Sequence, residues 1–475
     1  MSIIQGSSIP SAAGGVVPFD TTVIPNSVWI DGTADFLSAE LGAKTRTKAV
    51  IGTWFQKTGF TTGDATIFSK KGTAQFAMRM QDQASKQGLI SIFDFDGGDF
   101  QYSAESPAGG MVLRDIGWYH IMISIDTTAS AGNRLRYFIN GIDRTNTLTV
   151  GTDYTASDNP SITGGSGEPT QWGVGPGGAS QFSPIYLAQS FMLDDDSIQN
   201  NDVGVPDILD TFTYGTNGSQ FAPKANSDIA SLASSAGGDS FCLDYANSSD
   251  LGNDISSQGN DFSPTSMAAA NQSSNTPSLV YPIFNPLAQA GTATGTLSEG
   301  NTKLALASDN GVTATLTLPS TGLYYWEMDW TSGANGIYPG VCVQSAVGST
   351  GGSPHSRTDT WVWLAGDGSG RAFNGSSLVS YVGSATSVGK IAVCFDSDNT
   401  AMYFGTISSS TITWLNSGNP TSGSSKTGAA PFTSLPTDET IFIYQSTGSA
   451  STNQYLFDED EWTGVTNRPA AALSL

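Results

Sequence analysis

Short runs in which apolar and polar residues alternate recur along this chain of 475 residues. In residues 323–330 (LYYWEMDW), Trp326 and Met328 would share one face of a strand, and Glu327 and Asp329 would share the other, because successive side chains of a strand point to opposite faces. Gly, Ser and Asn turns separate such runs, and few helical patterns lie between them. This pattern predicts antiparallel β-sandwiches.

The composition agrees with this fold class. Hydrophobic residues make up 38 % and aromatic residues 10 % of the chain, which is enough to form buried cores. Charged residues make up only 13 %, against about 25 % in an average globular protein, and there are 55 glycines. The length predicts two or three domains.

The predicted strands fall into two groups. We expect strands at residues 74–81, 89–95, 118–126, 134–141 and 185–193, and then at 313–319, 323–330, 340–345, 361–366, 390–396, 401–405, 411–415 and 440–445. The sequence therefore predicts an all-β chain with two tandem antiparallel sandwiches of the jelly-roll, concanavalin-like kind.

Composition shifts suggest four segments. Residues 1–25 read as an N-terminal arm rich in Gly, Ser and Pro, and residues 26–215 as the first sandwich. Residues 216–290 are rich in Asn, Ser and Gly and read as an extended connector, in which residues 225–238 could hold a short helix. Residues 291–475 form the second sandwich.

The first half resembles the laminin-G-like, concanavalin-type jelly rolls. The turn Asn140–Gly141 matches a hairpin of that family, and such turns need positive φ. The resemblance rests on AVIGTWFQKTG (49–59), IFSKKG (67–72), GWYHIMISIDTTASAGNRLRYFINGI (117–142) and IYLAQSFMLDDDSI (185–198).

The second half resembles a SPRY-type sandwich, and the segment between the halves resembles one found in bacteriophage virion proteins. The SPRY resemblance rests on LPSTGLYYWEMDW (318–330) and VGKIAVCFDSDNTAMYFG (388–405). The virion resemblance rests on the opening MSIIQG and on GTNGSQFAPK (215–224), FCLDYANSSDLGNDISSQGNDFSP (241–264) and NTPSLVYPIFNPL (275–287).

The resemblance implies a structural protein of a phage particle that attaches to its host. We expect a tail or head fibre that binds cell-surface glycan without catalysing a reaction. Other virion proteins, host surface polysaccharide and further copies of this chain would be its partners. A capsid decoration or purely architectural protein would have the same sequence features, and a cellular SPRY module is disfavoured by the phage-like segment.

The net charge of the chain disfavours some classes of partner. The formal net charge is −23, so nucleic acid and anionic membranes are disfavoured, and acidic glycans would need a bridging divalent cation. The N-terminus, MSIIQGSSIPSAAGG, lacks the pattern of a secretory signal, and no stretch approaches 18 apolar residues. We expect assembly in the host cytoplasm and release within a virion.

Three cysteines lie in separate apolar runs. Cys242, Cys342 and Cys394 are too widely spaced for a disulfide framework or a metal knuckle. Buried free thiols are the preferred interpretation.

A glycan depolymerase is the enzymatic alternative. Glu327 and Asp329 alternate on one strand face, and retaining glycosidases need two carboxyl groups about 5–5.5 Å apart. The third acid that such strands usually carry is missing, since Thr331 and Ser332 follow Trp330. The preferred interpretation is an acidic pair that faces solvent or binds a loop.

Calcium is the one cofactor that the sequence leaves open. Asp396 and Asp398 alternate as oxygen ligands do at the start of a calcium loop, but a hairpin turn explains them equally. Residues 194–196 (Asp-Asp-Asp) could bind calcium or cap a short helix, and residues 458–461 read as a solvated acidic face.

Tryptophans are the candidate sugar-binding residues. Trp361 and Trp363 would share one strand face, and Trp172 lies in a Gly-rich stretch. They could form a stacking platform for a saccharide, although burial in the core is the default for such residues.

Overall fold

The computed structural model describes residues 24–42, 44–59, 63–81, 88–107, 113, 116–194, 201–202, 223–291, 295–333, 336–348, 353–366, 370–375, 377–381, 389–432, 435, 439–470 and 472–473. They divide into two compact units, residues 24–280 (unit 1) and residues 281–473 (unit 2). The N-terminal arm predicted for residues 1–25 lies outside the described residues except for its last two.

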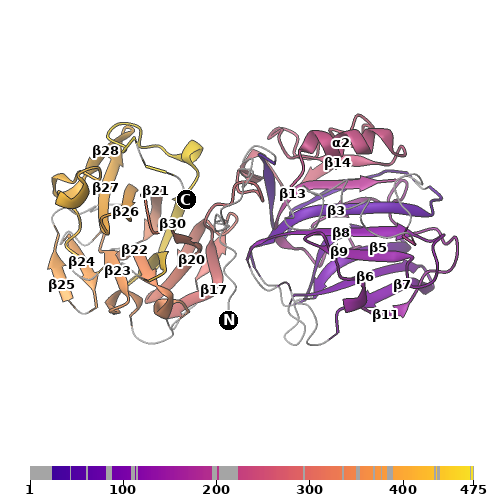
Figure 1. Ribbon diagram of the computed structural model, residues 1–475, viewed down its shortest axis with the longest axis horizontal. Helices are drawn as coiled ribbons and strands as arrows, with labels where there is room; N and C mark the ends of the chain where they lie inside the picture. Colours follow the sequence, from indigo (N-terminus) through magenta and orange to yellow (C-terminus); the bar gives the residue numbers. More distant parts are fainter. Residues whose placement is uncertain are drawn as a thin grey trace, which may run out of the picture. The chain divides into compact units, whose positions relative to one another are not determined.

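Unit 1 is a sandwich of two antiparallel sheets (Figure 1). The strands of sheet A, in spatial order, are β10 (Ile142–Asp143), β9 (Leu135–Ile139), β8 (Trp118–Asp126), β3 (Lys48–Lys57), β13 (Pro184–Leu193), β1 (Ser27–Asp31) and β16 (Gln272–Ser273), with β14 (Phe241–Leu243) also paired to β13. The strands of sheet B are β11 (Thr149–Thr152), β7 (Asp99–Glu105), β6 (Leu89–Asp96), β5 (Ala74–Gln81), β4 (Asp64–Lys70), β12 (Thr170–Trp172), β2 (Phe36–Ala39) and β15 (Ser263–Thr265).

The core of unit 1 lies between these sheets. Ile51 and Phe55 of β3 pack there from sheet A, and Phe76, Met78 and Ile92 pack there from sheet B. All five side chains are fully buried, so the alternation seen in the sequence sets the inward face of each strand.

The Asn-Gly hairpin follows the expected geometry. Asn140 has φ 49° and Gly141 has φ 72°, which are the two positive values that a tight two-residue turn between β9 and β10 requires. The Asn140 carboxamide also accepts a hydrogen bond from the backbone N–H of His120 at 2.8 Å.

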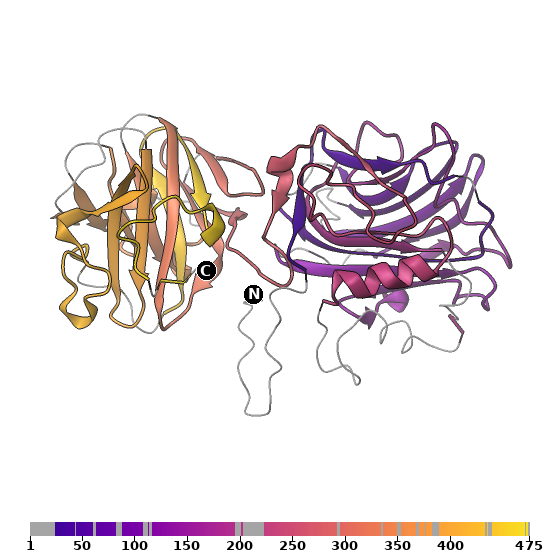
Figure 2. The same cartoon turned by 90° about the horizontal axis from the view of Figure 1, so that it is seen from above.

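One α-helix occurs among the described residues, and it covers the outer face of sheet A. This helix, α2 (Asn226–Ser235), buries Ile229 and Ala233 against Phe191, Phe138 and neighbouring residues of the sheet. Figure 2 shows α2 on the outside of the strand layers of unit 1. The helix predicted within residues 225–238 is therefore present.

The polar stretch that the sequence presents as a connector is part of unit 1 up to residue 280. β14, β15 and β16 pair with β13, β2 and β1 respectively, so this stretch adds strands to both sheets. Side chains order the loops between them, because the Asp254 carboxylate accepts hydrogen bonds from the backbone N–H groups of Cys242, Ser256 and Asn260. Polar residues that satisfy backbone groups do not give the alternating pattern of a strand.

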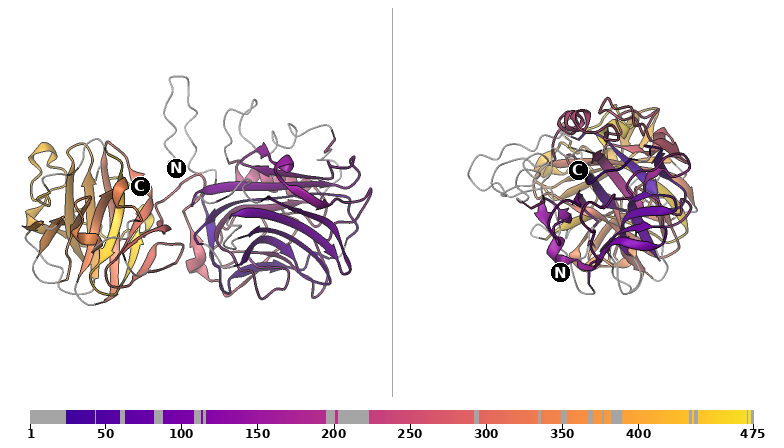
Figure 3. Two further views of the ribbon diagram at one scale, coloured as in Figure 1. Left: turned by 90° about the horizontal axis from the view of Figure 1, so that it is seen from below. Right: turned by 90° about the vertical axis from the view of Figure 1, so that its right-hand side faces the viewer.

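Unit 2 is a second sandwich of two seven-stranded antiparallel sheets (Figure 3). Sheet C contains β17 (Phe284–Gly291), β20 (Asn310–Leu318), β29 (Ile441–Thr447), β22 (Ile337–Val343), β23 (Thr360–Trp363), β24 (Arg371–Asn374) and β25 (Ser377–Ser380). Sheet D contains β18 (Thr296–Ser298), β19 (Lys303–Leu306), β30 (Ser451–Leu456), β21 (Leu323–Gly333), β26 (Gly389–Asp396), β27 (Ala401–Ser408) and β28 (Thr411–Trp414).

These sheets confirm the all-β fold class and the two antiparallel sandwiches. Residues 281–287, which the sequence places in the connector, lie in unit 2, where β17 pairs with β20. Short 3-10 helices complete the loops of both units: η1 (Thr145–Thr147), η2 (Ala269–Asn271), η3 (Gln344–Ala346), η4 (Pro354–Ser356), η5 (Leu415–Ser417), η6 (Gly423–Ser425) and η7 (Glu459–Glu461). Within the described ranges, no helix has the length and apolar character needed to cross a membrane.

Candidate functional site

The outer face of sheet B carries a groove of about 580 Å³ over strands β5, β6, β7 and β11. Its lining residues are Gln75, Arg79, Ser91, Ile92, Phe93, Phe95, Phe100, Ser103, Ala104, Glu105, Thr149 and Gly151. A volume in this range is typical of small-ligand sites in proteins.

The strand register places these side chains in rows across the sheet. In one row Arg79 of β5 pairs with Ser91 of β6, which pairs with Glu105 of β7. Two residues farther along β6, Phe93 pairs with Ser103. After another step, Phe95 pairs with Phe100. One end of the groove is therefore charged and the other is aromatic.

The aromatic end is a cluster of three phenylalanines. Phe100 lies with its ring centroid 5.5 Å from that of Phe95 and 6.1 Å from that of Phe93, in edge-to-face geometry. Phe100 is 51 % exposed, which is unusual for so large an apolar side chain. A register shift between Asp94 and Phe95 lets Phe100 join this face of the sheet.

The charged end is built around Arg79. Its guanidinium carbon lies 4.9 Å from the centroid of Phe93, and Nη1 pairs with the Asp64 carboxylate at 2.8 Å. Its Nε is buried without a hydrogen-bond partner. On the other side, the Glu105 carboxylate accepts a hydrogen bond from the Gln81 carboxamide at 3.3 Å.

Gly151 leaves one wall of the groove without a side chain. At Gly151 of β11, a Cβ atom would lie 2.9 Å from the hydroxyl oxygen of Ser103. A larger residue there would displace Ser103 and narrow the groove. Apolar rings beside hydrogen-bonding groups suit a ligand with an apolar face and polar edges, and no residue of the groove needs to react with it.

The tryptophans singled out from the sequence lie in the cores rather than in this groove. Trp172 is fully buried, 4.8 Å from the ring of Phe68. Trp363 is fully buried 5.3 Å from Phe404, and Trp361 is 4 % exposed. None of the three presents a ring face for a saccharide, and packing between the sheets explains all of them.

The acidic pair of β21 is not arranged as a catalytic pair. Glu327 is fully buried, whereas Asp329 is partly exposed. The Glu327 carboxylate accepts hydrogen bonds from the Tyr325 hydroxyl (2.8 Å), the backbone N–H of Thr463 (2.8 Å), the Thr463 hydroxyl (2.8 Å) and the backbone N–H of Gly464 (2.7 Å). The carboxylate therefore binds the C-terminal segment to the outer face of sheet D.

The calcium candidates have other roles in the geometry. Asp396 accepts hydrogen bonds from the backbone N–H of Asn399 (3.0 Å) and from its carboxamide (2.8 Å), as in a hairpin turn, while Asp398 is exposed. Asp458 caps η7 by accepting from the backbone N–H of Asp460. In the described residues no three carboxylate, imidazole or thiol groups converge on one point. Calcium binding stays a prediction from the sequence.

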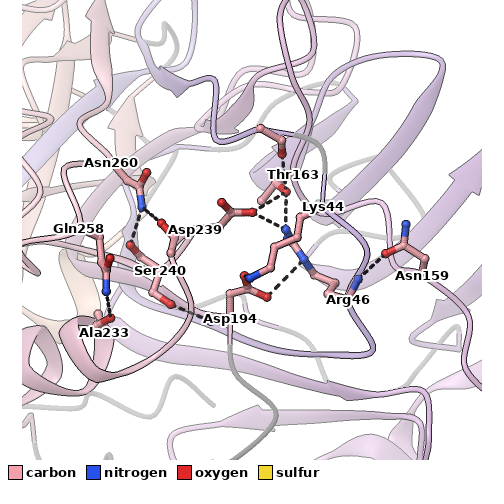
Figure 4. A network of polar contacts seen from close by, with 12 residues as sticks. Lys44, Arg46, Asn159, Thr163, Asp194, Ala233, Asp239, Ser240, Gln258 and Asn260 are labelled. Atoms are coloured by element: carbon pink, nitrogen blue, oxygen red, sulfur yellow. Dashed lines mark hydrogen bonds and ion pairs between the residues drawn. The ribbon is translucent and has the colours of Figure 1, made fainter.

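Asp194 belongs to a neutral cluster of charges shown in Figure 4. Its carboxylate pairs with Lys44 and lies 3.4 Å from Nε of the buried Arg46, whose Nη2 pairs with Asp239 at 2.6 Å. Two cations and two carboxylates thus fasten the loop before β3 to the end of β13 and to the turn before β14. Asp195 and Asp196 lie outside the described residues.

The histidines and cysteines lie outside the lining of the groove. His120 packs 5.1 Å from the ring of Trp54, and burial lowers its pKa to about 3, which keeps the ring neutral. His355 lies in unit 2, stacked 4.0 Å from Tyr338. The three cysteines are free and buried, as the sequence predicts.

The groove was not predicted from the sequence, although one signal for it is present there. In residues 89–96 (LISIFDFD), Ile90 and Ile92 take the inward positions, so Phe93 and Phe95 must lie on the outward face. Apolar residues on both faces of a strand near a hairpin indicate either a covered face or an exposed site. Only the register between β5, β6 and β7 shows that Arg79 and Glu105 also line the groove.

Comparisons with known proteins give weak structural likenesses. No family model matches the chain, and no curated protein matches it. Among solved structures, the PSpry domain of TRIM65 is 11 % identical, with 38 % of this chain and 90 % of that chain covered and a TM-score of 0.30. The SPRY domain of human HERC1 is 16 % identical, with 36 % and 96 % covered and a TM-score of 0.27.

A pentraxin gives a likeness of the same weight. The heptameric SAP-like pentraxin from Limulus polyphemus is 11 % identical, with 43 % of this chain and 87 % of that chain covered and a TM-score of 0.30. The neighbours are thus β-sandwich domains of the SPRY and pentraxin type.

Proposed function

We propose that this protein binds saccharide through the groove on sheet B and serves as a host-attachment component, a tail or head fibre, of a bacteriophage particle. The observation that carries the saccharide proposal is the exposed ring of Phe100 beside Phe93 and Phe95, next to hydrogen-bonding side chains. Pyranose rings present C–H faces that pack on aromatic rings, while their hydroxyl groups need donors and acceptors.

The bacteriophage part of the proposal rests on the resemblance of residues 241–264 and 275–287 to virion proteins. An attachment role requires binding and no catalysed reaction. A single groove of this size binds a short saccharide weakly, and a particle that displays many copies gains avidity without new contacts. Other virion proteins and further copies of this chain are the proposed partners.

A polysaccharide array tests the proposal. Purified full-length protein should bind at least one bacterial surface glycan at micromolar concentration and should compete with phage for host cells. The Phe100→Ala variant should bind at least tenfold more weakly, because Phe100 supplies an exposed ring of the groove. The matched control is Ile142→Ala, which removes another exposed apolar side chain, 53 % exposed, outside the groove lining.

The same assay separates the alternatives. Absence of glycan binding at micromolar concentration, in protein that is folded and present on the particle, would support an architectural or capsid-decoration role instead. Release of oligosaccharide from host capsule would support a depolymerase. The burial of Glu327 and its four hydrogen bonds disfavour that alternative.

A further inference from the structure

We infer that the groove on sheet B selects a neutral sugar that carries an acetamido group, an N-acetylhexosamine. This inference rests on the proposed saccharide function and adds the class of ligand. Three observations support it: the charge around the groove, the row of Arg79, Ser91 and Glu105, and the position of the phenylalanines beside that row.

The charge around the groove disfavours acidic sugars. Arg79 is the cation of the lining, and its guanidinium already pairs with Asp64. Glu105 lines the groove, and Asp96 and Asp99 are exposed in the hairpin next to Phe95 and Phe100. A uronate or sialate carboxylate would meet more negative than positive charge, so the ligand is not an acidic sugar.

The charged row is suited to an amide. Ser91 is short and lies between Arg79 and Glu105, so the two long side chains form opposite walls about 10 Å apart at the backbone. An amide presents an acceptor and a donor on opposite sides. Its carbonyl can accept from the guanidinium of Arg79, a side chain that lines the groove and is 20 % exposed, and its N–H can donate to the Glu105 carboxylate.

The aromatic residues lie next to that row. Phe93 is two residues from Ser91 on the same face of β6, about 7 Å away, and Phe95 follows at the next step. An acetamido methyl group placed over Ser91 would contact Phe93, while the sugar ring would extend over Phe95 and Phe100. A hydroxyl group at the same carbon offers neither the methyl group nor two opposed hydrogen-bonding groups.

Three trisaccharides that differ only in the substituent at C2 test the inference. Tri-N-acetylchitotriose carries acetamido groups, cellotriose carries hydroxyl groups, and chitosan trimer carries ammonium groups. Titration calorimetry on the full chain should give an affinity for tri-N-acetylchitotriose at least tenfold higher than for the other two. In saturation-transfer NMR the acetamido methyl should receive the strongest signal. N-acetylgalactosamine and galactose form a second pair that shows whether the C4 configuration matters.

The Glu105→Gln variant tests the proposed contact between Glu105 and the acetamido group. It should reduce the preference for acetamido over hydroxyl sugars to less than threefold, because the carboxylate acceptor becomes a weaker carboxamide. The control Asp228→Asn, on α2 away from the groove, should keep the full preference. Phe100→Ala should weaken binding of all three trisaccharides.

The outcomes separate the two proposals. Equal or tighter binding of cellotriose or chitosan trimer, still weakened by Phe100→Ala, would overturn the acetamido inference and leave the saccharide function standing. Binding of no saccharide, on these probes or on the array, would remove both. An unchanged preference in Glu105→Gln would also contradict the assigned contact.

Discussion

Asp94 is a buried residue whose ionised side chain lowers the stability of the fold. It lies on the inward face of β6, fully buried, and one carboxylate oxygen accepts from the Tyr154 hydroxyl (2.9 Å) and the backbone N–H of Ser161 (3.0 Å). The other oxygen has no partner. Burial raises the pKa of Asp94 from 3.8 to about 6, so ionisation at neutral pH opposes folding.

Asp94→Asn should therefore stabilise unit 1 above pH 6 by about 2 kcal/mol, because the charge is lost and the accepting oxygen is kept. The folded chain holds a proton between pH 3.8 and 6 that the unfolded chain releases. The contribution of Asp94 to the free energy of unfolding thus falls as pH rises through that interval. Denaturant unfolding at pH 4 and pH 7 should show a gain only at pH 7, with Asp228→Asn, exposed on α2, as the control. An equal gain at both pH values would contradict this account.

Glu327 binds the C-terminal segment, which is the loop-binding role that the sequence favoured over catalysis. Glu327→Gln should destabilise unit 2 by about 2–4 kcal/mol. The carboxylate accepts hydrogen bonds from N–H and O–H groups of Thr463 and Gly464, and the NH₂ group of a carboxamide would face one of these donors instead of accepting from it. Thermal unfolding checks this value, and Asp329→Asn, partly exposed on the same strand, should change stability by less than about 0.5 kcal/mol. A stable Glu327→Gln variant would mean that the C-terminal segment is held by other contacts.

At the scale of elements, strands were predictable and polar loops were not. The alternation in residues 74–81 and 323–330 predicted β5 and β21 with their inward faces, since burial imposes a period of two. The stretch from 238 to 280 lacks that period. Its order comes from side chains that bind backbone groups, such as the Asn260 carboxamide donating to the carbonyls of Gly238 and Ser240.

Asp254→Ala tests this view of the polar stretch. The substitution removes the acceptor for the backbone N–H groups of Cys242 and Asn260 and for the Ser256 hydroxyl, and it leaves buried donors without partners. We expect a loss of about 2–3 kcal/mol in the stability of unit 1 and faster amide exchange in β14. The exposed Ser248→Ala should have no effect. If Asp254→Ala were equally neutral, this stretch would owe its order to apolar packing alone.

Prediction of the candidate site requires the register between the strands as well as the positions of the strands. Phe93 and Phe95 are two residues apart in sequence, but Arg79 and Glu105 meet them only through the pairing of β5, β6 and β7. The tryptophans were predicted as stacking residues for a saccharide, but their large apolar rings fill the cores.

At the scale of the whole molecule, each unit has its own two sheets and its own core. Calorimetry of the full chain should therefore show two unfolding transitions. At pH 7, Asp94→Asn should raise the midpoint of one transition and Glu327→Gln should lower that of the other. Movement of both transitions by either variant would show that the units unfold together.

The proposed function places a saccharide site on sheet B of unit 1. Hydrogen–deuterium exchange of the full chain, with and without a saturating glycan identified on the array, locates the site most directly. We expect slower exchange in the peptides that cover β5, β6, β7 and β11, and no change in unit 2. Protection in the loops of unit 2, with the β6–β7 hairpin unchanged, would contradict it.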